Sequence, residues 1–322
     1  MSGGRLVPPR RQGLLGEVSG GRTQPVRRSY PYAVGDRIAG DLTVFGHLSP
    51  GRFAHLYQVW SAGEWAAFTC KILSPKLRDD RRARAALRRE ARILRPLRHP
   101  NIVRTFGQGE HDGLPFLLME YLEGPSLFEV LESRPKRMLG VADAVRTALH
   151  AGAAIYQLHR RGFVHLDLKP ANLLFRDSIP VLVDFDAARP ILPARSPSWV
   201  PGTAPYMAPE QVRREPPTPA ADIYGLGAVL YEMVTGRWPF EAVYQEEEPR
   251  TGVERQYPQL GLALPPPPRA FNPEVPEALE RTILRCLAPQ PADRFESMHQ
   301  LLLALVTVLD GPEALWPHGV YA

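Results

Sequence analysis

The chain is poor in cysteine and in long apolar runs, and each scarcity excludes a class of protein. Its 322 residues include two cysteines, Cys70 and Cys286, which excludes a disulfide-stapled secreted scaffold and favours a reducing compartment. The longest largely apolar run, residues 301–309, is far shorter than the roughly 20 residues that a membrane-spanning helix needs. The first residues contain no apolar stretch typical of a signal peptide. We therefore expect a cytoplasmic protein without a membrane span.

Lysine is also scarce. The 39 basic residues include four lysines, at positions 71, 76, 136 and 169, and the rest are arginine. The compact ammonium of lysine and the planar guanidinium of arginine are not interchangeable where a single point charge must contact a phosphate. In a chain that uses arginine almost everywhere, the positions that keep lysine are therefore candidates for chemistry.

The net charge of +5 is carried by one end of the chain. Residues 1–30 contain six arginines and a single acidic residue, Glu17, whereas the rest of the chain has 33 basic and 33 acidic residues. We expect residues 1–30 to form a flexible basic tail, because they are rich in Gly, Pro and Ser and lack periodicity. With 44% hydrophobic residues, the chain as a whole can bury a core, and its neutral body makes no case for a nucleic-acid-binding domain.

Hydrophobic periodicity divides the body into two parts. The first part has strand-like alternation in five segments and one amphipathic helical segment, residues 78–97. The second part is helical, with a central segment at residues 222–235 that is apolar nearly all round and therefore predicted to be buried. The predicted strands are residues 42–48, 54–60, 65–73, 102–106 and 114–121, and the other predicted helices are 143–161, 278–287 and 298–309. Residues 241–277, with three consecutive glutamates and four consecutive prolines, are predicted to be a surface loop.

The segment HLDLKPANLL, residues 165–174, contains groups that phosphoryl transfer needs. Asp167, Lys169 and Asn172 supply a carboxylate to orient a hydroxyl, a cation for phosphate and an amide ligand for Mg²⁺, and Asp184 follows an apolar strand twelve residues after Asn172. With this spacing the sequence resembles the eukaryotic-type (Hanks-type) serine/threonine protein kinases, as found in bacteria. The resemblance runs from about residue 40 to about residue 310.

The resemblance implies an α+β, bilobal fold with a five-stranded antiparallel sheet and one helix in the N-lobe and a larger, mainly helical C-lobe. The implied domains are a tail at 1–30, an N-lobe at 31–122, a C-lobe at 123–310 and a C-terminal extension at 311–322. The implied catalytic residues are Asp167 and Lys169, and the implied metal ligands are Asn172 and Asp184. The other residues implied to bind ATP are Leu48, Gly51, Leu56, Thr69, Lys71, Glu90, Met119, Glu120, Leu122 and Leu174, with Asn172 and Asp184 contributing to the same site.

Further matching positions support this reading. The resemblance implies that Lys71 pairs with Glu90, that Glu210 in MAPE pairs with Arg294, and that the buried Asp222 braces the catalytic loop. It also implies that His165 packs under Phe185. Thr203, in the GTAPYM stretch, matches a threonine near the catalytic aspartate and argues against tyrosine specificity.

Three departures from the family pattern change the expectations. The glycine loop keeps only Gly51, with Ser49 and Ala54 at the other two positions, so we expect weaker nucleotide binding. Asp186 replaces a glycine and adds a carboxylate beside Asp184, which leads to the hypothesis of a retained activity that favours Mn²⁺. Leu166 replaces an arginine that pairs with a phosphorylated activation segment. Phosphorylation of Ser196 and Ser198 is therefore not expected to be an obligatory switch.

These observations leave alternatives open. The leading hypothesis is a protein kinase that uses ATP and Mg²⁺ on a serine or threonine of a protein substrate, and the alternative is a pseudokinase that binds nucleotide as a scaffold. A small-molecule phosphotransferase would usually lack the MAPE and ADRF segments. The arginines of residues 78–98 form either a solvated helix face, which we favour, or a surface for acidic partners. His159 is read as a packed or capping residue and Cys70 as a buried small side chain rather than a reactive thiol. The sequence gives no signal for the oligomeric state.

Overall fold

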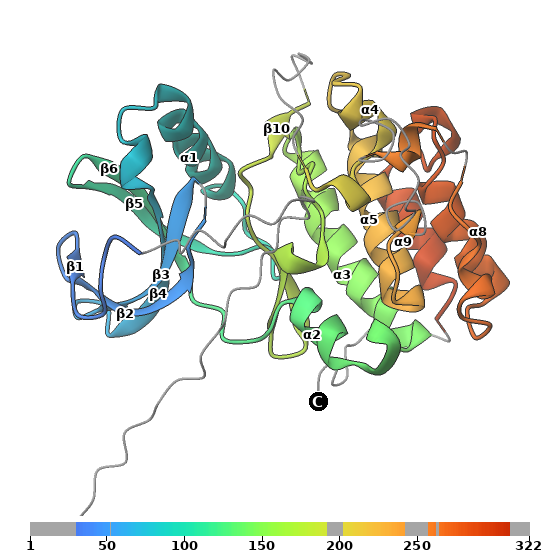
Figure 1. Cartoon of the computed structure of the whole chain (residues 1–322), viewed down its shortest axis with the longest axis horizontal. Coiled ribbons are helices and arrows are strands. Elements are labelled where there is room, and N and C mark those ends of the chain that lie inside the picture. The colour runs from blue at the N-terminus through green and yellow to red at the C-terminus, as the bar shows by residue number, and fades with distance from the viewer. Residues whose placement is uncertain (1–29, 52, 192–201, 242–256, 262–263, 310–322) are drawn as a thin grey trace, which may run out of the picture. The chain divides into compact units, whose positions relative to one another are not determined.

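The computed structural model describes residues 30–51, 53–191, 202–241, 257–261 and 264–309 (Figure 1). Residues 1–29 of the predicted basic tail, the predicted C-terminal extension, Ser196 and Ser198 lie outside the described residues. Tyr30, the last residue of the predicted tail, is instead half-buried and stacks on His47. The chain divides into two compact units. The smaller unit holds the described residues up to Arg95 together with Arg104–Tyr121, and the larger unit holds Pro96–Val103 together with the described residues from Leu122 on.

The smaller unit is built on an antiparallel sheet with the strand order β1-β2-β3-β4-β6-β5. The strands are β1 (Arg37–Ile38), β2 (Leu42–Ser49), β3 (Ala54–Ser61), β4 (Ala66–Leu73), β5 (Thr105–His111) and β6 (Leu114–Glu120). The central strand β4 is rich in apolar residues and buries Cys70, Ile72 and Leu73, as expected for a strand paired on both sides.

Helix α1 (Arg81–Leu94) packs against this sheet. It begins at Asp80, whose side chain accepts hydrogen bonds from the amides of Arg82 and Ala83, and it ends just before Pro96, which disfavours helical geometry at the preceding residue. Its buried residues recur at helical spacing, at Ala83, Leu87, Ala91 and Leu94. One face of α1 therefore joins the core of the smaller unit, while its arginines remain on the other faces.

The larger unit is mainly helical (Figure 1). Its α-helices are α2 (Leu127–Ser133), α3 (Val141–Arg160), α4 (Pro209–Val212), α5 (Pro219–Thr235), α8 (Glu277–Cys286) and α9 (Met298–Val306). Two short antiparallel pairs complete it: β7 (Phe163–Val164) with β10 (Arg189–Pro190), and β8 (Leu173–Arg176) with β9 (Ile179–Leu182).

Helix α5 forms the centre of the larger unit. Every residue from Ala221 to Thr235 is buried, and the helix packs against α3 and α8. This agrees with its apolar sequence, since a helix that is hydrophobic all round must be covered on every face. Asp222 and Glu232 are buried charged residues in this apolar helix, so each must have partners.

A buried ion pair links the segment between α8 and α9 to α4. The guanidinium of Arg294, 1% exposed, meets Glu210 through two bonds, Nη1 to Oε1 at 2.6 Å and Nη2 to Oε2 at 2.8 Å. The remaining donors of Arg294 reach the carbonyl oxygens of Ala288, Ala220 and Pro289. The predicted Glu210–Arg294 pair is therefore confirmed, in the bidentate geometry that suits an arginine and a carboxylate.

The structure corrects two details of the predicted fold. The sheet has six strands rather than five, because the short strand β1 adds to its edge. The segment predicted as a strand at residues 102–106 is also wrong in position, since the strand is β5, Thr105–His111. Ile102 and Val103 are buried in the larger unit instead, where Ile102 pairs with Leu182 of β9. Among the described helices, none is both long and apolar enough to cross a membrane.

Candidate active site

Lys71 and Glu90 form a buried ion pair within the smaller unit. Lys71 lies on β4 and Glu90 on α1, and Nζ is 2.9 Å from Oε1 and 2.8 Å from Oε2 of Glu90. The two side chains are 8% and 0% exposed. A lysine held in this way presents a fixed cation, and loss of either partner would leave an uncompensated buried charge. The pairing expected from the sequence is present.

Several predicted nucleotide residues share one face of the sheet. Side chains alternate across a strand, so Thr69 and Lys71 of β4 point to the same face. Leu56 of β3 is directly opposite Lys71, and Met119 of β6 is directly opposite Thr69. Met119 is buried, whereas Leu56 and Thr69 are half-buried. The sheet thus places apolar side chains beside the lysine, as an adenine ring next to phosphates would require.

In the loop between β2 and β3, Gly51 is the one glycine of the family's glycine-loop pattern that this chain keeps. A β-carbon on Gly51 would lie 2.3 Å from the carbonyl oxygen of Ala54, so no other residue fits this turn as it stands. Leu48 and Ser49 end β2 and are half-buried. Glycine is therefore required at position 51, although Ser49 and Ala54 replace the flanking glycines of the family pattern.

In the larger unit, Asp167 is surrounded by polar partners. Lys169 Nζ lies 2.9 Å from Asp167 Oδ2 and donates to Thr203 Oγ1 at 2.9 Å, and the Thr203 hydroxyl donates to Asp167 Oδ1 at 2.8 Å. Asn172 donates its Nδ2 to the carbonyl oxygen of Asp167 at 2.8 Å and to Oδ2 at 3.2 Å. A carboxylate, an ammonium, a hydroxyl and an amide are therefore fixed against one another. Such an arrangement can orient an acceptor hydroxyl and offset negative charge.

The backbone of this group is held by Asp222 of α5. Its Oδ2 accepts the amide of His165 and its Oδ1 accepts the amide of Leu166, each at 2.8 Å. His159 Nε2 lies 2.8 Å from the same Oδ2, and Asp222 is 1% exposed. Leu166 has φ of 67°, a left-handed conformation that is uncommon for a non-glycine residue. The carboxylate thus fixes two successive amides at a strained turn directly before Asp167.

Electrostatics keep Asp222 ionised in this buried position. Burial alone would raise its pKa, but the hydrogen bond and charge of His159 and the hydrogen bond from the amide of His165 outweigh burial and lower the pKa below the usual aspartate value. Burial lowers the pKa of His165, so its imidazole is neutral at pH 7. The predicted packing of His165 on Phe185 is confirmed, with ring centroids 4.9 Å apart in an edge-to-face arrangement.

The hairpin of β8 and β9 brings Asn172 and Asp184 to the same end. Leu173 pairs with Leu182, and the amide of Val183 donates to the carbonyl oxygen of Asn172 at 2.9 Å. Because the Asn172 Nδ2 is engaged with Asp167, its Oδ1 is the atom suited to a cation. A carboxylate oxygen of Asp184 and one of Asp186 lie within 4.8 Å of each other. Carboxylate and amide oxygens are the ligands that Mg²⁺ prefers, so these residues fit a divalent cation.

The remaining predicted residues divide between the two units. Glu120 ends β6, and both its amide and its carboxylate bond to the backbone of Arg104. Leu122 is buried and Leu174 is half-buried, and both belong to the larger unit. Cys70 is also buried, and burial raises the pKa of its thiol to about 12. This agrees with the reading of Cys70 as a small core side chain rather than a reactive thiol.

Two supporting residues were missed or given a smaller role in the sequence analysis. Gln211 donates its Nε2 to the carbonyl oxygen of Leu166 at 2.9 Å, which fixes the catalytic turn from the side of α4. His159 was read as a packed or capping residue but is a direct partner of Asp222. The position of His159 six residues before His165 is the only sequence signal for this role, and nothing local marks Gln211.

Comparisons with known proteins agree with this geometry. The family model described as protein kinase domain matches residues 42–304. The chain is 30% identical to the serine/threonine-protein kinase PrkC of Bacillus subtilis over 285 residues, which cover 86% of this chain and 42% of PrkC. It is 33% identical to the serine/threonine-protein kinase PknB of Mycobacterium tuberculosis over 260 residues, which cover 76% of this chain and 39% of PknB. The chain therefore spans about two fifths of the length of these curated relatives.

A solved structure gives the same answer for the fold. The PknI kinase domain of Mycobacterium tuberculosis matches with a TM-score of 0.65 and 26% sequence identity, covering 86% of this chain and 99% of that domain. The bilobal kinase fold expected from the sequence is thereby confirmed. With a family match over most of its length and relatives at or above 30% identity, the chain belongs to the protein kinase family.

Proposed function

We propose that this chain is a serine/threonine protein kinase that transfers the γ-phosphoryl group of ATP to a hydroxyl of a protein substrate. The observation that carries the proposal is the group formed by Asp167, Lys169, Thr203 and Asn172, with the turn before it held by Asp222. Phosphoryl transfer depends mainly on positioning and electrostatics, and this group supplies both. The names of the relatives, all serine/threonine-protein kinases, support the same choice of acceptor.

Each residue of the group has a distinct task in the proposed reaction. Asp167 accepts a hydrogen bond from the acceptor hydroxyl and directs its oxygen towards phosphorus. Lys169, already 2.9 Å from Asp167, offsets negative charge on the transferred phosphoryl group. The Thr203 hydroxyl bridges Lys169 and Asp167 and so fixes their separation before the substrate arrives. Asn172 donates to Oδ2 of Asp167, the oxygen that Lys169 also contacts, and to the carbonyl oxygen of Asp167.

ATP and its metal are assigned to residues of both units. In the smaller unit, Lys71 contacts the α and β phosphates, the backbone around Gly51 covers the phosphates, and Leu48, Leu56, Thr69 and Met119 surround adenine. Glu90 holds Lys71, and the backbone groups of Glu120 and Leu122 bond to the adenine edge. In the larger unit, Leu174 contributes to the adenine site, and Asn172 and Asp184 ligate the metal. The metal neutralises phosphate charge when bound.

Asp186 influences which divalent metal the proposed site favours. Its carboxylate lies within 4.8 Å of Asp184 and brings a second negative charge to the place where the metal is expected. We propose that Mn²⁺ supports the reaction at least as well as Mg²⁺, because an additional anionic ligand suits a cation that tolerates less regular coordination. The cytoplasmic location, the domain boundaries at residues 30, 122 and 310, and the dispensability of Ser196 and Ser198 phosphorylation stay predictions.

Replacement of Asp167 tests the proposed activity. With ATP and either Mg²⁺ or Mn²⁺, we expect the chain to form phosphoserine or phosphothreonine on itself or on a generic protein substrate, detected by mass spectrometry. Asp167→Asn should lower the rate about 100-fold or more, because it removes the carboxylate that orients the hydroxyl. If the unaltered chain transfers no phosphate with either metal, the scaffold alternative is correct instead.

Thr203 tests the importance of the fixed geometry. Thr203→Val keeps the shape but removes the hydroxyl that joins Lys169 to Asp167, so the transfer rate should fall roughly tenfold or more. Thr203→Ser keeps the hydroxyl and should retain most of the activity. Steady-state rates of the two variants, compared at equal thermal stability, provide the measurement. Equal activity of the valine and serine variants would show that the hydroxyl has no role.

Asp186 can be returned to the glycine of the family pattern. We expect Asp186→Gly to lower the ratio of the Mn²⁺-supported rate to the Mg²⁺-supported rate, because one carboxylate leaves the metal surroundings. Asp177→Gly is the matched control, since Asp177 lies at positive φ in the turn between β8 and β9. An Asp186→Gly variant with unchanged rates and an unchanged ratio would refute the assignment.

A further inference from the structure

Four consecutive prolines, Pro265–Pro268, lie at the surface of the larger unit in an extended, polyproline II conformation. The proline ring fixes φ at about −65°, and a residue that precedes a proline is confined to extended backbone. Each residue from Leu264 to Pro267 precedes a proline, so the sequence itself imposes this conformation on the run. Pro267, with φ of −58° and ψ of 135°, has the backbone angles of such a helix. None of the roles proposed above for ATP, metal or the acceptor hydroxyl uses this segment.

The proline run buries one of its three edges. A polyproline II helix has three residues per turn, so residues three positions apart share an edge. Pro265 and Pro268 are three apart and buried, whereas Pro266 and Pro267 between them are exposed. Leu264, which shares an edge with Pro267, is 46% exposed. One edge therefore packs on the larger unit, and the other two edges present apolar side chains to solvent.

Hydrogen bonds to the larger unit fix the run in place. The hydroxyl of Tyr231, a buried residue of α5, donates to the carbonyl oxygen of Pro266 at 3.0 Å. Directly after the run, the amide of Arg269 donates to Oε2 of Glu280 on α8 at 2.8 Å. A segment that is already held in its bound conformation loses less conformational entropy when a partner binds it. The run is therefore organised in advance for recognition.

A cation and an aromatic ring follow the prolines. Arg269 is exposed, and no other described residue forms a hydrogen bond or an ion pair with its guanidinium. Phe271 is 39% exposed, and the guanidinium of Arg237 lies 5.0 Å from the centre of its ring. A partner that fits this surface is apolar where it contacts the prolines and acidic where it contacts Arg269.

We propose that this proline surface, Leu264–Arg269, is the docking site for a protein domain whose aromatic-lined groove binds polyproline II segments. Such grooves pack aromatic rings against the prolines of a segment that is extended before it binds. A groove covers only part of the circumference of its ligand, so the buried edge of the run leaves two edges for contact. An acidic side chain at the border of the groove pairs with Arg269 and fixes the direction in which the run lies.

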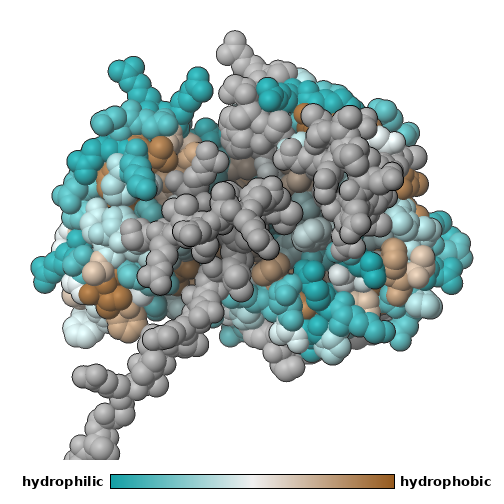
Figure 2. Space-filling view, viewed as in Figure 1, coloured by the Kyte–Doolittle hydropathy of each residue, from teal (hydrophilic) through white to brown (hydrophobic). Residues whose placement is uncertain are grey.

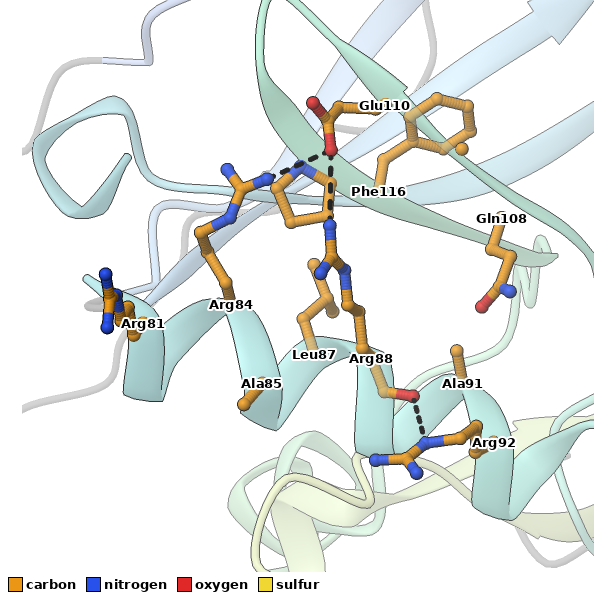
Figure 3. Close-up of a pocket in the computed structure, with 12 residues that line it drawn as sticks. Arg81, Arg84, Ala85, Leu87, Arg88, Ala91, Arg92, Gln108, Glu110 and Phe116 are labelled. Atoms are coloured by element: carbon orange, nitrogen blue, oxygen red, sulfur yellow. Dashed lines mark hydrogen bonds and ion pairs between the residues drawn. The ribbon is translucent and has the colours of Figure 1, made fainter. Parts of the chain in front are cut away.

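The smaller unit carries a second positively charged surface. It is a hollow of about 690 Å³ between α1 and the strands β5 and β6, and its lining includes Arg81, Arg84, Arg88 and Arg92 (Figure 3). Figure 2 shows hydrophilic side chains standing out where Figure 1 places α1. Glu110 Oε2 lies 3.0 Å from Arg84 Nη2 and 3.4 Å from Arg88 Nη2 in this hollow. General attraction of an acidic domain to these arginines is the alternative to recognition of the prolines.

Titration of the full chain into an isotope-labelled SH3 domain and an isotope-labelled WW domain, each with acidic residues beside its groove, tests the proposal by NMR and without ATP. We expect at least one domain to bind, with saturable shifts confined to its aromatic groove. Pro266→Ala with Pro267→Ala keeps the buried edge and should weaken binding roughly tenfold or more, because apolar contacts and stiffness are lost together. Arg269→Gln should weaken it roughly several-fold, because a charge-assisted contact is lost.

Two control variants remove the same kinds of side chain elsewhere. Pro31→Ala with Pro216→Ala removes two exposed prolines outside the run, and Arg88→Gln with Arg92→Gln removes two exposed charges from α1. Both variants should bind as the unaltered chain does. A free peptide of residues 262–271 separates the folded surface from its sequence. The folded chain should bind at least as tightly as this peptide, because its run is already fixed.

Several results would overturn the proposal. They are the absence of binding to both domains, equal losses in the two double proline variants, and a loss in the Arg88 and Arg92 variant as large as that in Arg269→Gln. Binding of the peptide without binding of the folded chain would show that the buried edge is needed, and would contradict docking on this surface. A concentration-dependent dimer that neither domain disrupts, lost in the Pro266 and Pro267 variant, would replace the domain by a second copy of the chain as the occupant.

Discussion

The buried carboxylate of Asp222 is the constraint on which the catalytic part of the structure depends. It lies in the most buried helix of the larger unit and accepts the amides of His165 and Leu166 together with the imidazole of His159. Three donors on one carboxylate compensate its removal from water and keep it ionised. The surrounding core holds α5 in place. Through its hydrogen bonds to two backbone amides, the Asp222 carboxylate therefore also holds in place the turn that begins the catalytic loop.

The position of Asp167 follows from this support. Leu166 is held from both sides, by Asp222 at its amide and by Gln211 at its carbonyl oxygen, and it keeps a backbone conformation that is unfavourable for leucine. Such strain persists only where the surrounding structure enforces it. With the turn fixed, Lys169, Thr203 and Asn172 can meet Asp167 at hydrogen-bond distance. The replacement of an arginine by Leu166 therefore leaves the geometry of the loop intact, since that geometry rests on backbone groups.

The sequence predicted the features that depend on residue type and spacing. The scarcity of lysine singled out Lys71 and Lys169, and both have carboxylate partners in the structure. Features that depend on tertiary contacts were not predictable. The strand β5 lies at the sheet edge and exposes most of its polar sequence, so it lacks the apolar alternation that marks a strand, while the apolar Ile102 and Val103 beside it belong to the core of the larger unit. Likewise, nothing near Gln211 indicates its bond to Leu166, and no pattern in the sequence indicates that α1, β5 and β6 line a common hollow.

Hydrogen exchange at residues 165–167 tests most directly whether the Asp222 carboxylate holds the catalytic loop. In the unaltered chain, the amides of His165 and Leu166 should exchange far more slowly than those of exposed loops, because both are buried and bonded to Asp222. Asp222→Ala should remove this protection while leaving the amides of the sheet in the smaller unit protected, and phosphotransfer should fall with it. If residues 165–167 keep their protection in Asp222→Ala, the carboxylate does not hold the catalytic loop and the account is wrong.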